Sequence, residues 1–512
     1  MITQEPFYVV GVDMGTTSLR VGLFTPKGQL MASATKAINL NRSDTGWVEG
    51  VAQHYWKALV ACMRKVISGD VAPHVAGIVV GSTASTILGS REDGTPCTPV
   101  ILWMDARAAN EALEISNYLH QYTSHEWMLA KALWMSRHLA SWEQSELVVE
   151  LADWINFHLT GQWTASQCTS VCKWNWNELT LRTWQSCVGE SELTLGRGLD
   201  AELNHISQKW PQLVCAVGTP IGSLTDDAAM QLGLSRRTMV FEGAIDAYLA
   251  MIGSNCLTPS SLSLTLGTST VLLAPSNQPM PSNSIWGPFD SPIVKGQWVV
   301  EGGQLSSGIL LEWIARLLGT THQTLSQRAQ TIRPGSGGLM WTENIQGNRT
   351  PHRHAMARAG LYGLRIDHRP EFIYRAALEA TAMGAYEAFT TVVTAAQTKI
   401  SSIRASGGGA LDPLWLQIHA DVFGQSLSCP RHPEWAVLRG AAMLAVVGLG
   451  YYSSINYAAE AMAPSWMEIR PNEQNHKVYA QLLEVHRDVY NLEKQIDAKL
   501  YDALREVSNC EQ

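Results

Sequence analysis

The sequence contains no apolar run of the length that a membrane-spanning helix requires, roughly 18 residues or more. Its first residues also lack the basic region and the apolar core of a secretory signal peptide. We therefore expect a cytoplasmic protein that has no membrane as its partner.

Basic residues do not gather into a stripe or patch anywhere along the chain. Lysine and arginine total 37 against 45 aspartates and glutamates, which gives a formal net charge of −8. Because nucleic-acid-binding domains commonly carry a basic face, this balance argues against nucleic acid as the main partner.

Cysteines are few, odd in number and scattered. Of the nine, only Cys168 and Cys172 lie close together, and no second pair or histidine cluster completes a zinc site. The pattern favours reduced thiols in a cytosolic protein over a disulfide framework.

The chain is too long, at 512 residues, for one ordinary hydrophobic core. Apolar residues make up 46% and charged residues 16%, as in soluble globular proteins, so two large domains are expected. No linker is rich enough in proline or glycine to let two halves move independently. We therefore predict an N-terminal domain over residues 1–254 and a C-terminal domain over residues 255–512, hinged about a central cleft.

The most informative feature of the sequence is a motif that occurs twice, at residues 8–24 and 262–274. Each copy is an apolar strand, a tight turn of glycine and small hydroxyl residues, and a second apolar strand. The tip of such a hairpin exposes backbone N–H groups and hydroxyls to phosphate oxygens. Two copies suggest a duplicated α/β fold that binds a polyphosphate from both sides. The predicted phosphate-binding residues are Gly15, Thr16, Thr17 and Ser18 in the first copy, and Gly267, Thr268 and Ser269 in the second.

The rest of the chain alternates between strand and helix patterns. The segment over residues 163–198, which holds several tryptophans among polar residues, is interpreted as an insertion of short strands and loops outside the core. The pattern predicts buried strands at 75–81 and 99–103, and helices at 51–68, 370–395, from 413 and over 472–506.

Asp13 stands at the end of the first apolar strand, directly before the first turn. Burying a carboxylate there is costly unless a cation compensates it. A hydrated Mg²⁺ on the phosphates suits the position, because Mg²⁺ takes few carboxylates and several waters. The alternative is an aspartate that merely caps its own turn. Arg20 either faces solvent or contacts phosphate.

Asp246 lies among small residues at a predicted strand-to-helix corner, shortly before the second hairpin. A carboxylate in this position can accept the proton of an attacking hydroxyl during phosphoryl transfer to an alcohol. The alternative is a helix N-cap aspartate.

Three consecutive glycines, Gly407, Gly408 and Gly409, follow a predicted strand and precede a predicted helix. Without Cβ atoms, this backbone can lie against a flat nucleoside. The spacing is not that of the dinucleotide-binding motif. We interpret the turn as a nucleotide contact, with a plain strand-to-helix turn as the alternative.

Trp103 and Asp105 follow a predicted strand, where α/β folds place their ligands. Tryptophan can stack on the apolar face of a sugar, and aspartate can accept hydrogen bonds from its hydroxyls. The alternative is a core tryptophan beside a local pair of Asp105 with Arg107.

Taken in this order, the motifs resemble the FGGY family of carbohydrate kinases, whose members have a duplicated actin-like (ribonuclease H-like) ATPase fold. The resemblance spans the whole chain. The matching stretches are residues 11–18, 131–134, 218–222, 243–246, 266–270, 347–351, 360–363 and 406–409.

The resemblance implies phosphorylation of a terminal sugar hydroxyl with ATP and Mg²⁺ as cofactors. Asp246 would be the catalytic base, and would also contact the substrate. Asp13 would hold the metal, the two hairpin tips the phosphates, and residues 407–409 the adenosine. Thr83, Ala84, Trp103 and Asp105 would complete the sugar site. Dimers are common in the family, so a homodimer is also implied, although no feature of the sequence requires one.

The sugar itself is less sharply indicated, because the segment over residues 82–86 matches no single branch of the family. Xylulokinase-like members carry Gln-Met-His there and glycerol kinases carry Arg-Glu, whereas this chain has small hydroxyl residues similar to those of ribulokinases. The stretch over residues 101–107 is similar to xylulokinases. We expect a five-carbon ketose, D-xylulose or D-ribulose, with glycerol, erythritol or another polyol as the alternative.

Two other classes of protein share the paired hairpins. One is an actin-like ATPase without sugar chemistry, such as a chaperone or filament module, and the other is an inactive sugar-binding relative. The first lacks a base in the setting of Asp246, and the second is disfavoured because Asp13, Asp246 and both hairpins are intact.

Overall fold

The computed structural model describes residues 7–43, 46–120, 122–174, 198–354 and 356–510, and the chain divides into two units. Neither unit is one continuous stretch of sequence, so the predicted division between residues 254 and 255 stays a proposal. Unit 1 comprises Met1–Asn255, Phe289–Gln297 and Ala436–Ala463, and unit 2 comprises Cys256–Pro288, Trp298–Trp435 and Pro464–Gln512.

The main sheet of unit 1 has the strand order β12-β13-β6-β1-β2-β3. The predicted first hairpin is its antiparallel pair β1 and β2, and the central strands β1, β6 and β13 run parallel to one another. The strands are β1 (Tyr8–Met14), β2 (Ser18–Phe24), β3 (Leu30–Ala37), β6 (Val75–Ser82), β12 (Pro220–Ser223) and β13 (Met239–Phe241).

The main sheet of unit 2 has the order β16-β17-β15-β14-β20-β21-β22. The second hairpin, β14 with β15, is again antiparallel, and β14, β20 and β21 again run parallel. In both sheets, antiparallel strands lie on either side of the three parallel strands. The strands are β14 (Ser261–Leu266), β15 (Thr270–Ser276), β16 (Trp286–Asp290), β17 (Trp298–Gln304), β20 (Ser402–Ser406), β21 (Leu427–Pro430) and β22 (Trp466–Ile469).

The two sheets therefore share the order and direction of five strands, and this confirms the predicted duplicated α/β fold. In chain order, β1, β2, β3, β6 and β13 correspond to β14, β15, β17, β20 and β21. The predicted strand over residues 75–81 is confirmed as β6, which is buried along nearly its whole length as expected of a central parallel strand.

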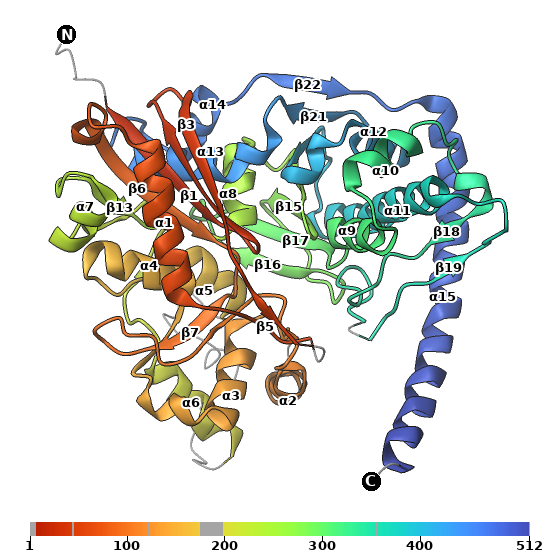
Figure 1. Ribbon diagram of the computed structural model, residues 1–512, viewed down its shortest axis with the longest axis horizontal. Helices are drawn as coiled ribbons and strands as arrows, with labels where there is room; N and C mark the ends of the chain where they lie inside the picture. Colours follow the sequence, from red (N-terminus) through yellow and green to blue (C-terminus); the bar gives the residue numbers. More distant parts are fainter. Residues whose placement is uncertain (1–6, 44–45, 121, 175–197, 355, 511–512) are drawn as a thin grey trace. The chain divides into compact units, whose positions relative to one another are not determined.

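Helices cover both faces of the unit 1 sheet (Figure 1). Helix α1 (Ala52–Val66) packs on β2 and β3, and confirms the helix predicted over residues 51–68. Helix α13 (Ala436–Gly448) packs on β1, β6 and α8 (Asp246–Gly253), although it comes from the second half of the chain. It approaches β1 so closely that a Cβ atom on Gly11 would overlap the carbonyl oxygen of Leu438.

A second, five-stranded sheet in unit 1 corrects one strand prediction. The strand expected over residues 99–103 is only β8, and it pairs antiparallel in this smaller sheet rather than lying in the parallel one. A strand of two buried residues is too short for its sequence to distinguish a parallel from an antiparallel strand. The order is β4 (Asn41–Arg42), β5 (Val48–Gly50), β8 (Val100–Ile101), β7 (Ile87–Ser90) and β9 (Leu147–Glu150).

The prediction that residues 163–198 form an insertion outside the core is wrong for the part of this segment that the structure describes. Helix α5 (Gln167–Lys173) lies there and most of its residues are buried, and Trp174 joins an apolar core with α3 (Met128–His138). The many polar residues of this segment indicated exposure to solvent. The residues that bury them come from distant segments, so the sequence pattern did not reveal the burial. Residues 175–197 of the same segment lie outside the described residues.

Helix α11 (Pro370–Ala396) is the central helix of unit 2 and packs on β15, β17 and α12 (Pro413–Phe423). Both helices confirm predictions from the sequence. The predicted helical tail is α15 (Glu473–Cys510), which packs on α11 and α12 (Figure 1).

No helix among the described residues combines the length and apolarity needed to cross a membrane.

The remaining elements connect these layers. These elements are α2 (Ala109–Leu119), α4 (Leu151–Thr160), α6 (Leu199–Gln208), α7 (Asp226–Leu232), α9 (Gly308–Leu317), α10 (His322–Ala329), α14 (Ile455–Ala461), β10 (Ala165–Ser166) with β11 (Val214–Cys215), and β18 (Met340–Trp341) with β19 (Leu361–Tyr362).

The contact between α13 and β1 gives a first prediction. Gly11→Ala should destabilise unit 1 by about 2 kcal/mol or more, because helix or strand must move to admit the methyl group. Thermal unfolding followed by fluorescence should show a lower midpoint. Gly69→Ala is the matched control, since a Cβ atom there meets open space. Equal midpoints for the two variants would contradict the packing described.

Candidate active site

Three chain segments with predicted functional residues end at one edge of the unit 1 sheet. In the parallel register Asp13 lies opposite Gly81, and Ser82 forms an isolated bridge with Ile245. Asp246 is the next residue after that bridge. The carboxyl ends of neighbouring parallel strands thus place Asp13, the segment after β6 and Asp246 side by side, where open α/β sheets bind ligands.

Asp13 is buried at this edge and has a cationic neighbour. It is 4% exposed, and Arg20 Nη1 lies 3.5 Å from its Oδ2 atom. Burial raises the pKa of the Asp13 carboxyl, and the positive charge of Arg20 partly opposes that rise. Arg20 therefore lies against the carboxylate, where the sequence had left its direction open.

These surroundings fit the predicted magnesium site. A single buried carboxylate beside a turn that is predicted to bind phosphate suits an ion that keeps most of its waters. No group of three or more histidine, cysteine, aspartate or glutamate residues that could hold a metal occurs within the described residues.

The first hairpin tip is closed by its own backbone and remains partly exposed. The Gly15 N–H donates to the Ser18 carbonyl over 3.0 Å, and the Ile38 N–H donates to the Thr17 carbonyl over 2.9 Å. Thr17 is exposed, while Gly15, Thr16 and Ser18 are half-buried. The small hydroxyl residues of this turn are thus within reach of a ligand, as its predicted role requires.

Asp246 is the first residue of α8 and is half-buried. Its Oδ1 atom accepts a hydrogen bond of 2.7 Å from the backbone N–H of Ala247. An aspartate carboxylate in this position can accept a proton from a bound hydroxyl group. Asp246 does not occupy the N-cap, which is Ile245, so the alternative interpretation as an N-cap aspartate is not met.

The segment after β6 is joined to Trp103 by a chain of hydroxyl contacts. Thr83 Oγ1 lies 2.8 Å from Thr86 Oγ1, which accepts a 3.2 Å hydrogen bond from the Trp103 backbone N–H. The Trp103 indole in turn donates to Thr16 Oγ1 over 3.0 Å. The structure therefore brings Thr83, its neighbour Ala84 and Trp103 together with the first hairpin tip.

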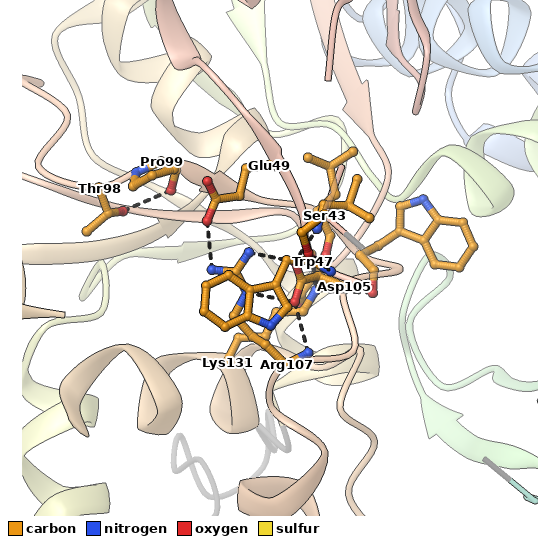
Figure 2. Close-up of polar contacts among 12 residues, drawn as sticks. Ser43, Trp47, Glu49, Thr98, Pro99, Asp105, Arg107 and Lys131 are labelled. Atoms are coloured by element: carbon orange, nitrogen blue, oxygen red, sulfur yellow. Dashed lines mark hydrogen bonds and ion pairs between the residues drawn. The ribbon is translucent and has the colours of Figure 1, made fainter. Parts of the chain in front are cut away.

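Asp105 lies deeper than the other predicted sugar contacts. Its side chain is fully buried and accepts hydrogen bonds from the Val48 N–H over 2.5 Å and from the Arg107 guanidinium over 2.8 Å. Figure 2 shows this guanidinium between Asp105 and Glu49. The local Asp105–Arg107 pair, which the sequence offered as the alternative, is thus present, and direct contact of Asp105 with sugar remains a prediction.

The sequence reasoning missed the role of Lys131. This residue of α3 has no exposed surface, and its ammonium donates to the carbonyls of Ser85, Leu102 and Trp103. Burial lowers the pKa of Lys131 to about 8, although nearby carboxylates, Asp105 foremost, favour the charged form. A lone lysine in the apolar stretch of residues 128–135 was the available signal.

In unit 2 the second hairpin tip packs on the start of α9. The backbone N–H groups of Gly308 and Ile309 donate to the carbonyls of Gly267 and Thr268, each over 3.1 Å. Gly267, Thr268 and Ser269 stay half-buried. The tip is therefore held by its carbonyls, and a ligand can approach from the exposed side.

The glycine turn lies beside this tip. A Cβ atom on Gly407, whose φ is 88°, would overlap the carbonyl oxygen of Leu266, and one on Gly409 would overlap the Trp415 ring. Gly408 differs, because it is exposed and a Cβ atom there would meet nothing within 4 Å. Packing explains two of the three glycines, and the third faces open space.

The predicted residues therefore fall into two sets. Unit 1 holds Asp13, Thr83, Ala84, Trp103, Asp105, Asp246 and the first tip, and unit 2 holds the second tip and the glycine turn.

Comparison with known proteins identifies the family to which both parts of the chain belong. Residues 8–253 match the N-terminal domain of the FGGY family of carbohydrate kinases, and residues 262–449 match its C-terminal domain. A xylulose kinase of Staphylococcus epidermidis is 25% identical, with 96% of this chain and 98% of that protein covered. A D-ribulokinase of Saccharomyces cerevisiae is 26% identical, with 86% and 72% covered.

Among solved structures, the fold is similar to that of a ligand-bound xylulose kinase from Lactobacillus acidophilus. The TM-score is 0.80 at 22% identity, and the match covers 96% of this chain and 99% of that chain. The two family domains together span most of the sequence, in the expected order. The chain belongs to the FGGY family of carbohydrate kinases.

Proposed function

We propose that this carbohydrate kinase transfers the γ-phosphoryl group of ATP to a terminal hydroxyl of a five-carbon ketose, D-xylulose or D-ribulose. In this proposal unit 1 supplies the sugar site, the base and the metal ligand. Unit 2 supplies the second phosphate-binding tip and the adenosine contact.

The observation that supports the proposal most strongly is the shared sheet edge of unit 1. The bridge between Ser82 and Ile245 puts Asp246 next to the segment that carries Thr83 and Ala84. A base must lie within hydrogen-bond reach of the proton that it accepts, so it has to neighbour the acceptor site. This proximity supports Asp246 as the base for a sugar bound at Thr83 and Trp103.

The transfer itself needs little covalent chemistry from the protein. Asp246 accepts the proton of the sugar hydroxyl while the oxygen of that hydroxyl forms a bond to the γ-phosphorus. The bond from that phosphorus to the bridging oxygen breaks, and ADP leaves with the electron pair. Positioning of the two reactants supplies much of the rate.

In this proposal groups at each tip would meet the charge of the phosphates. Asp13 would hold Mg²⁺, largely through water, and the ion would neutralise negative charge on the phosphates. Backbone N–H groups and hydroxyls of residues 15–18 and 267–269 would contact the phosphate oxygens.

The choice of a five-carbon ketose rests on the sequence and on the names of relatives. The segment over residues 82–86 carries the small hydroxyls of ribulokinase-type relatives, whereas residues 101–107 are similar to xylulokinases. The similar proteins named above include a xylulose kinase and a D-ribulokinase. Glycerol, erythritol or another polyol is the second candidate.

A coupled assay of ADP formation tests the proposal directly. D-xylulose, D-ribulose, glycerol and erythritol are each added to the protein with ATP and Mg²⁺. We expect the largest kcat/KM for one of the two ketoses. Faster turnover with a polyol would move the assignment to the second candidate, and ATP hydrolysis that no sugar stimulates would indicate an ATPase without sugar chemistry.

Asp246→Asn should abolish most of the phosphorylation. The amide keeps the shape of the side chain but cannot accept the proton, so kcat should fall by about 100-fold or more. Sugar binding, measured by calorimetry, should persist. Asp226→Asn is the matched control, an exposed aspartate in the first turn of α7. Near-normal turnover by Asp246→Asn would contradict the assignment of the base.

Gly408→Ala tests the adenosine contact. Because the new methyl group enters open space, the thermal midpoint should stay unchanged. A nucleoside lying against this backbone would be displaced, so KM for ATP should rise about tenfold while KM for the sugar stays constant. An unchanged KM for ATP would remove Gly408 from the nucleotide site.

A further inference from the structure

Lys131 is buried between the two segments that carry the predicted sugar contacts. Its Nζ atom donates to the Ser85 carbonyl over 2.6 Å, on the segment that bears Thr83 and Ala84. It also donates to the carbonyls of Leu102 over 2.6 Å and Trp103 over 3.1 Å. One ammonium group therefore contacts the backbone just before β7 and the backbone just after β8, beside the point where Ile87 and Ile101 pair these two strands.

Each of its three protons has a carbonyl acceptor. An ammonium group has three donors and no acceptor, so all three bonds require the charged form. A neutral amine has two protons and a lone pair, and the lone pair would then face a carbonyl oxygen. Loss of the proton would both break one bond and introduce repulsion.

The charges that face Lys131 come from several elements. Asp105 and Arg107 follow β8, Glu150 ends β9 and Glu126 precedes α3. The three carboxylates favour the charged lysine, whereas Arg107 disfavours it. Arg107 is itself neutralised by Asp105 and Glu49, and its guanidinium lies 4.3 Å from the Trp47 ring centroid (Figure 2).

We propose that Lys131 is a positioning residue for the sugar site, whose ammonium sets the distance between the Thr83–Ala84 segment and Trp103. The inference rests on the proposed function, because it assumes that these segments contact the sugar. Lys131 does not itself touch the substrate in this arrangement, since its donors are all directed at backbone carbonyls. It acts through the backbone that it holds.

The position of this lysine makes the sugar site sensitive to alkaline pH. Its pKa is about 8, well below the ordinary value for lysine, since burial penalises the charged form. As the pH rises through that value the ammonium loses a proton, and the two segments lose a shared donor. The affinity for sugar should therefore fall above about pH 8 while the affinity for ATP does not.

Lys131→Met tests the role of the ammonium, because methionine keeps the apolar stem and removes the charge. With the sugar that the panel identifies, we expect kcat/KM for the sugar to fall about tenfold or more, mainly through KM. KM for ATP should stay within about twofold of the unaltered protein. A loss confined to kcat, or an equal rise of both KM values, would overturn the proposal.

Lys173→Met is the matched control. Lys173 is also a buried lysine of unit 1, with its Nζ atom 5.9 Å from the Phe289 ring centroid. We expect this variant to keep the sugar KM. A similar rise of the sugar KM in both variants would show that any buried lysine in the unit has this effect, and would overturn the assignment to Lys131.

A pH profile provides a test that does not depend on Lys131→Met folding. For the unaltered protein, kcat/KM for the sugar should fall with a midpoint near pH 8. Glu126→Gln removes one negative charge that favours the ammonium, so the midpoint should move to lower pH. Lys131→Met, where it folds, should lack this transition. A midpoint that Glu126→Gln leaves in place would overturn the inference.

These outcomes are separate from those of the proposed function. Absence of sugar-stimulated turnover in the unaltered protein refutes the proposed function. Sugar phosphorylation with an unchanged sugar KM in Lys131→Met refutes only the positioning role.

Discussion

The parallel pairing of β1, β6 and β13 is the constraint on which the unit 1 site depends. Parallel strands end at the same edge of a sheet, so each following segment starts beside its neighbour. The register that sets Asp13 opposite Gly81 and Ser82 opposite Ile245 therefore also fixes where Asp246 lies. A shift of one residue in the pairing would turn the side chains of a strand to the opposite face of the sheet. Because helices pack on both faces, such a shift would disrupt the packing of the core. The packing of the core therefore fixes the register, and the register fixes the positions of the residues at the strand ends.

The duplicated topology places different chemistry at equivalent positions. The segment after β6 and the turn after β20 both follow the second parallel strand of their sheets. Unit 1 carries small hydroxyl residues there, including Thr83, whereas unit 2 carries the glycine turn at residues 407–409. Hydroxyl side chains suit the polar edge of a sugar, and bare backbone suits a flat ring. The two units therefore differ at equivalent strand ends by only a few residues, and this difference is the basis for predicting two kinds of ligand contact.

The buried charges beside Trp103 and the segment after β6 belong to a single network. Asp105 and Arg107 pair with each other, and Lys131 is directed at carbonyls a short distance away. Burying such groups costs free energy unless every donor and acceptor has a partner. In return, a satisfied network fixes the backbone more tightly than apolar contacts do. Precise placement of Trp103 is the gain that would justify this cost.

Much of this arrangement was accessible from the sequence alone. The paired hairpins predicted the duplication, and the family resemblance, the helices at residues 51–68 and 370–395 and the strand at 75–81 were all confirmed, because they depend on local periodicity and on short motifs. Tertiary structure decided the rest. It showed the short antiparallel β8, the burial of α5, the packing of α13 on unit 1 and the donors of Lys131. Each of these depends on partners that are distant in the chain, and no local pattern records them.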